Sequence, residues 1–182
     1  MVRKGLPMKI IEAMKKIKHL QEKCTDLRTK VAQYCADLDF ETPTYPDQKG
    51  QIQEWLQGHA DTLQEIARLR VAIQRTNLAT HVTIELGGRP VMKTIAEWIH
   101  RRGDAKKRDG LAHLDFAMWS TLGDRGLKEG NMQTTAGGLK EIRIRRHFDP
   151  KQRDKMIELF RNEPSIIDRT LEVVNAVTDL LD

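Results

Sequence analysis

Residues 10–38 read "IIEAMKKIKHLQEKCTDLRTKVAQYCADL", and the spacing of their apolar side chains decides the fold class. This spacing averages about 3.5 residues, which is typical of helices that pack along a continuous seam in bundles and coiled coils. We therefore predict a long helix from about Met8 to Leu38, beginning just after Pro7. Its seam consists of Ile10, Met14, Ile17, Leu20, Cys24, Leu27, Val31, Tyr34 and Leu38.

A second long helix is predicted from about Gln51 to Thr80. The segment before it, "ETPTYPDQKG" at 41–50, contains two prolines and a glycine and is therefore predicted as a loop. Asp47 in this loop is a candidate cap for the helix that follows. The predicted seam consists of Ile52, Leu56, His59, Leu63, Ile66, Leu69 or Arg70, Ile73, Asn77 and Thr80.

Asn77 and Thr80 are polar residues in this apolar stripe, and Asn175 and Thr178 repeat their spacing in "EVVNAVTDLL". A buried amide without a partner costs roughly 1–3 kcal/mol, and single polar seam residues can fix helix register and oligomeric state. We interpret these four as polar seam residues that form hydrogen bonds inside the bundle or at a subunit interface. The alternative is that Asn77 and Thr80 cap backbone groups in the last helical turn.

The middle of the chain mixes strand and helix signals. Val82, Ile84 and Leu86 alternate with polar residues, which predicts a short strand that ends at a Gly87-Gly88 turn. Pro90 is placed at the start of a third helix that reaches about Leu122. Because glycines at 103 and 110 weaken its middle, this segment is predicted either as one long helix or as two helices with a hinge.

A glycine-rich stretch at 122–138 is predicted as a flexible loop, followed by a basic strand within 140–148. The two strands either pair within the chain or pair with neighbouring subunits, because one strand cannot stand alone. Asp149-Pro150 predicts the start of the last helix, which runs to about Leu181 with a kink or restart near Pro164.

These segments predict a mainly α fold. We expect residues 1–182 to form one domain, an elongated antiparallel helical bundle of about four long helices with a small β element at about 82–86 and 140–148. Residues 123–148 are expected to protrude from it as an appendage. The composition agrees, because 39% apolar, 5% aromatic and 31% charged residues are typical of long amphipathic helices.

Several blocks of the sequence resemble the septicolysin-like family of small helical proteins of bacteria and their phages. The blocks are "MKIIEAMKKIKHLQEKCTDL", "IARLRVAIQRTNLATHV", "IAEWIHRR", "KEIRIRRHFDP" and "IIDRTLEVVNAVTDLL". The most specific is "IQRTNLATHV", which resembles the family's I-N-x-T-N-x-x-T segment. The chain departs from the family at Gln74, at Ala176 and in the insertion at 123–138. The resemblance implies a mostly helical fold and no defined activity.

The sequence contains no recognisable catalytic or cofactor motif. Its two serines, Ser120 and Ser165, lie outside G-x-S-x-G, and no phosphate-binding glycine loop is present. The six histidines are never four residues apart, and there is no C-x-x-C pair, so no metal site is predicted. We therefore expect a protein that is not an enzyme and has no catalytic residues, cofactor or metal.

Two basic clusters are the candidate partner-binding residues of a chain with a formal net charge of +5. They bind either the phosphates of a nucleic acid or the acidic residues of another protein; no stacking aromatics are interleaved with them apart from Phe148. The clusters consist of Arg101, Arg102, Lys106, Lys107 and Arg108, and of Arg143, Arg145 and Arg146.

Cys24 and Cys35 lie eleven positions apart in the first predicted helix, which separates them by about 16 Å and excludes a bond between them. We interpret them as buried thiols of a reducing compartment, with an interchain bridge as the alternative. Lysines interrupt the apolar N-terminal stretch, and no run approaches the length of a membrane span. We therefore expect a cytoplasmic protein, or a virion protein if a phage encodes it.

The function predicted from these observations is that of an oligomeric structural or assembly protein, such as a phage capsid-decoration, neck or tail accessory protein. Its expected partners are copies of itself, other structural proteins, or both. One alternative is a nucleic-acid-binding protein that uses residues 101–108 and 143–146. The other is a membrane-active, toxin-like protein that uses the lysine-rich first helix, although a membrane partner is not expected.

Overall fold

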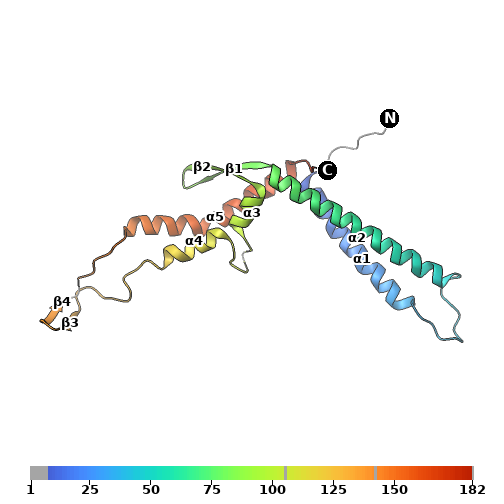
Figure 1. Cartoon of the computed structure of the whole chain (residues 1–182), viewed down its shortest axis with the longest axis horizontal. Helices are drawn as coiled ribbons and strands as arrows, with labels where there is room; N and C mark the ends of the chain where they lie inside the picture. The colour runs from blue at the N-terminus through green and yellow to red at the C-terminus, as the bar shows by residue number, and fades with distance from the viewer. Residues whose placement is uncertain (1–7, 105, 142, 182) are drawn as a thin grey trace. The chain divides into compact units, whose positions relative to one another are not determined.

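The computed structural model describes residues 8–104, 106–141 and 143–181, which form five α-helices and four short strands (Figure 1). This confirms the mainly α fold class. The chain divides into two compact units. The first unit contains the described residues up to Thr80 and those from Glu172 onward, and the second unit is His81–Leu171. The single domain and the protruding appendage stay predictions.

The first unit is built on a hairpin of two long helices, α1 (Ile10–Tyr34) and α2 (Gln48–Ala79), which run side by side in opposite directions (Figure 1). Both helices were predicted to within a few residues. Asp47 is the predicted cap, and its carboxylate accepts a hydrogen bond of 2.8 Å from the Gly50 amide. The carboxylate of Glu12 accepts a bond of the same length from the Lys9 amide, which closes the start of α1.

The buried side of α2 differs from the predicted seam. Leu56 and Leu63 were expected to face inward, but their exposed fractions are 54% and 49%. Buried threonines explain the shift, because the hydroxyl of Thr62 donates to the Gly58 carbonyl and that of Thr76 donates to the Ala72 carbonyl. A threonine that satisfies its hydroxyl within its own helix can be buried, although a hydrophobic pattern counts it as polar. The buried residues of α2 are Thr62, Ile66, Leu69, Ala72 and Thr76.

Three aromatic rings close the end of the hairpin where α1 passes into α2. Tyr34, Tyr45 and Trp55 pack with ring centroids 5.4–5.8 Å apart, and two of the three pairs meet edge to face. The side-chain amide of Gln48 donates to the Tyr34 carbonyl at 2.8 Å, so the first residue of α2 binds the last residue of α1. Cys35, at the end of α1, is exposed rather than buried as predicted, while Cys24 is half-buried, and both thiols are free.

The last residues of the chain pack onto the first unit. Lys9 and Asp179 form an isolated antiparallel bridge, and the Ile10 amide donates to the Thr178 carbonyl at 3.1 Å. The Leu180 amide donates to the Met8 carbonyl at 2.7 Å. The C-terminal segment is thereby bonded to the start of α1.

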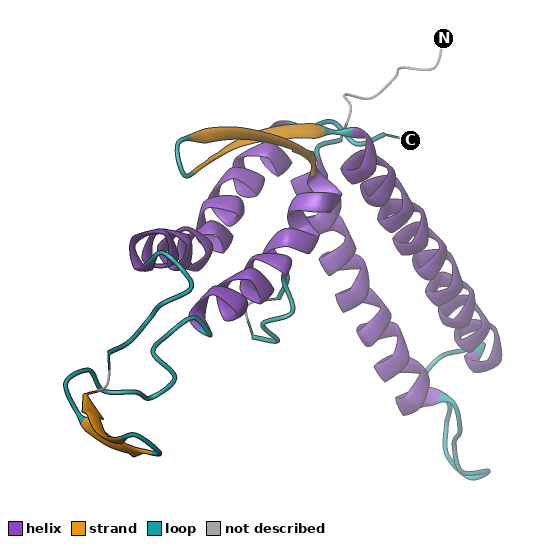
Figure 2. Ribbon diagram, turned by 60° about the vertical axis from the view of Figure 1, so that its left-hand side comes forward, coloured by secondary structure: helices purple, strands orange, loops and turns teal. Residues whose placement is uncertain are grey.

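The second unit begins with a hairpin of strands β1 (His81–Leu86) and β2 (Arg89–Thr94) (Figure 2). Gly87 and Gly88 form the predicted turn and have φ values of 59° and 77°, in the region that favours glycine. The prediction that Pro90 starts a helix was wrong. Pro90 lies in β2 opposite Glu85, and an edge strand tolerates a residue that lacks an amide proton.

The predicted third helix is two short helices, α3 (Ile95–Arg102) and α4 (Leu111–Ser120), as the hinged alternative proposed. Thr94 and Glu97 form a capping box that starts α3. Gly103, with φ of 65°, ends α3, and any side chain there would overlap the backbone of Gly110. Trp98 of α3 is fully buried, and its indole nitrogen donates to the Val82 carbonyl at 3.0 Å.

The basic strand predicted at 140–148 is much shorter in the structure. Strands β3 (Met132–Thr135) and β4 (Gly138–Glu141) form a second hairpin, which does not pair with the first (Figure 2). Residues 143–148 are not a strand, and Ile142 lies outside the described residues. The reason is that β3 begins at Met132, opposite Glu141, so residues beyond Glu141 have no partner strand.

The last helix, α5 (Pro150–Val177), starts where Asp149-Pro150 predicted. It is continuous through Pro164, so the predicted restart does not occur, while the predicted kink stays a prediction. Proline removes one amide donor from the helix, and here packing of the surrounding turn outweighs that loss: Phe160, Glu163 and Ile167 are all buried.

An ion pair between α1 and α2 makes the stability of the hairpin depend on pH. The ammonium of Lys16 lies 2.7 Å from Glu65 Oε1, and Arg68 binds the same carboxylate from within α2. Hydrogen bonds from Arg68 and Lys16 lower the pKa of Glu65 from 4.5 to about 2. A carboxylate with a lowered pKa contributes stability that is present above its unfolded pKa and is lost as the pH falls through its folded pKa.

We predict that Glu65→Gln reduces the stability of the protein at pH 6, and that the difference from the wild type shrinks between pH 4.5 and pH 2. Urea unfolding followed by circular dichroism at several pH values measures this difference. Glu54→Gln is the control, because the described residues give Glu54 no cationic partner and a bond only from Gln51. A difference that stays constant down to pH 2 would contradict the role of Glu65.

Candidate functional site

A buried ion pair joins three helices of the second unit. Glu163 of α5 is only 1% exposed, and Arg101 of α3 binds it with two parallel hydrogen bonds, Nε to Oε1 at 2.5 Å and Nη2 to Oε2 at 3.0 Å. The remaining terminal nitrogen of Arg101 lies 2.7 Å from Asp115 of α4. The guanidinium also lies over the ring of Phe160, 5.5 Å from its centroid. Arg101 therefore connects α3, α4 and α5 through one side chain.

The contacts of Arg101 hold the three helices together. The hydrogen bonds that Arg101 donates to Glu163, with a smaller contribution from those to Asp115, raise the pKa of Arg101 above its ordinary value, so the guanidinium keeps its charge. Each oxygen of Glu163 accepts one hydrogen bond from the guanidinium. A buried charge pair of this kind is needed for packing, because either partner alone would be an uncompensated buried charge.

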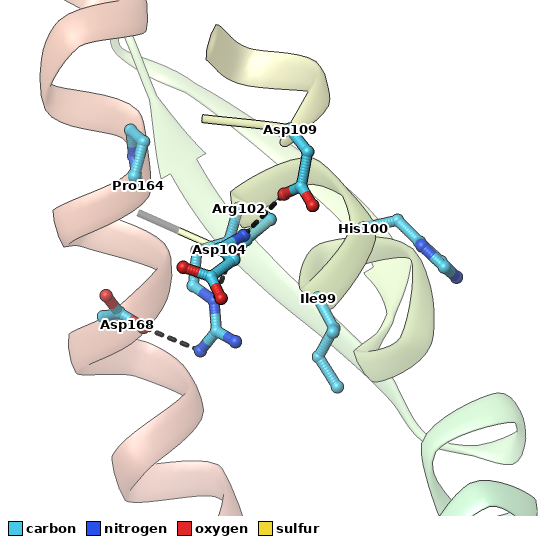
Figure 3. Close-up of a pocket in the computed structure, with 8 residues that line it drawn as sticks. Ile99, His100, Arg102, Asp104, Asp109, Pro164 and Asp168 are labelled. Carbon is cyan, nitrogen blue, oxygen red and sulfur yellow. Dashed lines mark hydrogen bonds and ion pairs between the residues drawn. The ribbon is translucent and has the colours of Figure 1, made fainter. Parts of the chain in front are cut away.

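An open pocket lies beside this junction, between α3, the loop that follows it and α5 (Figure 3). Two of its charged groups form an ion pair, and a third binds a backbone amide. Arg102 Nη1 lies 2.8 Å from Asp168, and the Asp104 amide donates to Asp109 at 2.8 Å. His100 points away from Asp168 in Figure 3. No group of three His, Cys, Asp or Glu residues suited to a metal ion exists within the described residues.

The first predicted basic cluster is divided by the fold. Arg101 and Arg102 are used in ion pairs inside the second unit. Lys106, Lys107 and Arg108 lie instead in the loop between α3 and α4, where their side chains are exposed. Asp104 organises this loop by accepting hydrogen bonds from the amides of Lys106 and Lys107.

The second basic cluster is divided in the same way. Arg146 binds Asp124 with two hydrogen bonds of 2.7 Å, and this pair lowers the pKa of Asp124 and raises that of Arg146. Arg143 is exposed and lies 3.8 Å from Glu141, a weak surface contact. Arg145 is exposed as well. The exposed basic residues of the two clusters thus include Lys106, Lys107, Arg108, Arg143 and Arg145.

The four predicted polar seam residues occupy different environments in the first unit. Thr80 is the C-cap of α2, and Asn175 lies half-buried on α5. Thr178 follows α5 and accepts the Ile10 amide through its carbonyl. Asn77 is half-buried, and its side-chain oxygen is buried without a hydrogen-bond partner in the described part of the chain. Their role at an interface stays a prediction.

Thr76 is the polar residue that links α2 to the C-terminal segment, and sequence reasoning missed it. It is fully buried, and its hydroxyl accepts the Leu181 amide at 2.9 Å while donating to Ala72. The neighbouring Asn77 and Thr80 match the apolar stripe by spacing, so they attracted attention instead. A signal was present in the sequence, because Thr62, Leu69 and Thr76 repeat at intervals of seven.

A second stripe of apolar residues runs along the exposed side of α2. Its members are 54%, 49%, 45% and 66% exposed in chain order. At about 100° per residue they lie on the side of α2 roughly opposite its buried residues. We call this set the outer stripe; it consists of Leu56, Leu63, Val71 and Leu78.

Comparisons with known proteins support the fold and add no activity. No profile of a known protein family matches the chain, and no curated protein matches it. The crystal structure of a functionally unknown conserved protein from Corynebacterium diphtheriae is similar, with a TM-score of 0.52 and 18% sequence identity. The match covers 97% of this chain and 100% of that chain. The septicolysin-like resemblance stays a prediction.

None of the helices formed by the described residues combines the length and the apolar character that crossing a bilayer requires.

We predict that Thr76→Val destabilises the protein by about 1–3 kcal/mol, because the isosteric change leaves the Leu181 amide without its acceptor. Thr80→Val, the same change four residues later, should cost less than about 0.5 kcal/mol, since the described residues show no bond to the Thr80 hydroxyl. Urea denaturation measures both variants. Equal losses would show that the Thr76 hydroxyl has no special role.

We predict that Glu163→Gln destabilises the second unit by about 1–3 kcal/mol, because the half-buried guanidinium of Arg101 loses its charged partner on α5. Asp115→Asn is the matched carboxylate-to-amide control. Asp115 is half exposed, so its loss should cost at most about 1 kcal/mol. Thermal unfolding of the two variants decides between them, and a similar shift in both would contradict the central role of Glu163.

Proposed function

We propose that this protein is a non-enzymatic, oligomeric structural or assembly protein that binds copies of itself or other protein subunits. The outer stripe of α2 carries this proposal. Four large apolar residues at helical spacing remain exposed on a helix that already buries its opposite side. Apolar residues that recur along one exposed side of a helix are typical of a surface that packs against another helix.

The β3–β4 hairpin supports the same function. All eight of its strand residues are exposed, including Met132 and Leu139, and it pairs with no other described strand. An isolated two-stranded hairpin is marginally stable in water, and its unpaired edges can accept a strand from another chain. Packing against a second subunit would stabilise it.

The setting of a phage particle, as a capsid-decoration, neck or tail accessory protein, is the finer part of this proposal. It rests on the resemblance to a family that includes phage proteins. A mostly helical subunit with exposed apolar residues suits repeated contacts in an assembly.

Nucleic-acid binding is the second candidate, favoured by the exposed loop that contains Lys106, Lys107 and Arg108. It has less support, because Arg101, Arg102 and Arg146 are engaged in internal ion pairs. The membrane-active alternative requires α1 to expose apolar side chains such as Ile10 and Ala13, which are buried in the first unit.

We predict that light scattering coupled to gel filtration gives a mass that is a multiple of 21.0 kDa at tens of micromolar protein. Gel retardation with duplex DNA and with RNA, at low and high salt, tests the second candidate on the same sample. A monomer without retardation would remove both self-assembly and nucleic-acid binding. Retardation that weakens steeply with salt, by a monomeric protein, would favour nucleic acid instead.

A further inference from the structure

We infer that the outer stripe binds the outer stripe of a second copy of this chain, with the two α2 helices antiparallel and a two-fold axis at Ala67. This inference rests on the proposed function and specifies its partner and its register. It follows from three observations: the symmetry of the stripe, the depression beside it and the charges at its margin.

The exposed positions along the stripe are symmetric about Ala67. In an antiparallel pair centred there, Leu56 faces Leu78 of the second copy and Leu63 faces Val71. Ala60 and Gln74, which are both exposed, face each other in the same way. A two-fold interface requires one surface to be complementary to itself, and this order of side chains meets that requirement.

A depression lies beside the middle of the stripe, lined by Ala67, Arg68, Val71, Ala72 and Arg75. The small side chain of Ala67 is exposed and allows another helix to approach closely at this point. In the antiparallel register Leu63 of the second copy lies at the level of Val71, which borders the depression. A large side chain that packs beside a small residue of the facing helix is typical of helices that interlock in coiled coils.

The charges beside the stripe favour the antiparallel direction. Asp61 and Arg75 are exposed on the same margin of α2, and the antiparallel register places Asp61 of each copy near Arg75 of the other. Arg68 lies closest to the axis, and Glu65 neutralises it with bonds of 2.8 and 3.1 Å. In a parallel pair the margin that carries Asp61 and Arg75 would face the opposite margin of the second copy, so neither contact between Asp61 and Arg75 would form.

The extent of the stripe sets the expected affinity. From Leu56 to Leu78 it spans about 33 Å at 1.5 Å per residue. Two helices in contact over this length make an interface at the small end of specific complexes, so we expect a dissociation constant in the micromolar range.

Cysteine crosslinking tests the register directly. In the full chain with Cys24 and Cys35 replaced by Ala, Ala67→Cys should form a covalent dimer under mild oxidation. Leu56→Cys alone and Leu78→Cys alone should not, whereas a mixture of these two variants should. Ala32→Cys is the matched control, because it makes the same substitution at an exposed position of α1. Pairing should make the Ala67→Cys reaction on the order of 100-fold faster than the control, since it raises the local thiol concentration from micromolar toward millimolar.

Exchanging the charges provides a second measurement that does not depend on disulfide geometry. Asp61→Arg and Arg75→Asp should each weaken the dimer about tenfold in sedimentation experiments, and the double variant should restore it. Both residues are exposed, so folding should be unaffected, which circular dichroism checks.

The outcomes separate this inference from the proposed function. If the wild-type chain is an oligomer but Ala67→Cys reacts no faster than Ala32→Cys, the inferred interface is wrong and the assembly function stands. Crosslinking of Leu56→Cys with itself would establish a parallel pair and overturn the register. If the wild-type chain remains a monomer at hundreds of micromolar, the second copy is not the partner and the self-assembly part of the proposed function fails as well.

Discussion

Two packed helices can cover only one side of each other, and this constraint shapes the first unit. The hairpin of α1 and α2 buries Ile66, Leu69 and Ala72 on one side of α2 and leaves the outer stripe in water. A third helix along this side would complete a bundle, as in most helical proteins, but the described residues supply none there. This exposed apolar side of α2 is therefore a candidate contact surface for another protein chain, and the proposed function rests on it.

The second unit depends on a different interaction. Short helices such as α3 and α4 are marginal by themselves, and Arg101 holds them against α5 through Asp115 and Glu163. Burying this carboxylate and guanidinium costs desolvation energy that the pair offsets by its two hydrogen bonds and its charge attraction. Ion pairs of this kind also reduce the basic surface that is left for a partner. Arg101, Arg102 and Arg146 were candidates for binding nucleic acid, but each of them binds a carboxylate of the protein itself.

The inferred dimer connects the exposed side of α2 with the proposed assembly function. The outer stripe is long, symmetric about a small residue and flanked by opposite charges, and these properties favour a second copy over an unrelated helix. The β3–β4 hairpin is a separate exposed element, with free strand edges and apolar side chains. This hairpin belongs to the second unit, so it is a candidate for contacts that are separate from those of α2.

Much of the fold was predictable from local patterns. The periodic apolar residues identified α1 and α2, Asp47 and Asp149 marked helix starts, and the Gly87-Gly88 turn was recognised because only a few residue types favour its backbone angles. These signals act over a few neighbouring residues. The failures lie where the partners are distant in the chain: the strand predicted beyond Glu141 had no neighbouring strand, and the helix did not restart at Pro164 because packing outweighed one missing hydrogen bond.

The candidate binding surfaces also depend partly on local sequence patterns and partly on tertiary contacts. By itself the sequence determined that long helices pack through apolar seams and that basic residues gather at 101–108 and 143–146. Only the tertiary structure decided which side of α2 is buried, since Thr62 and Thr76 enter the interior once their hydroxyls bind their own helix. Tertiary structure also decided which arginines are neutralised, because Glu163 and Asp124 approach Arg101 and Arg146 only after folding. Periodicity shows that a helix has an apolar side, whereas the choice between two such sides depends on the neighbours that the folded chain provides.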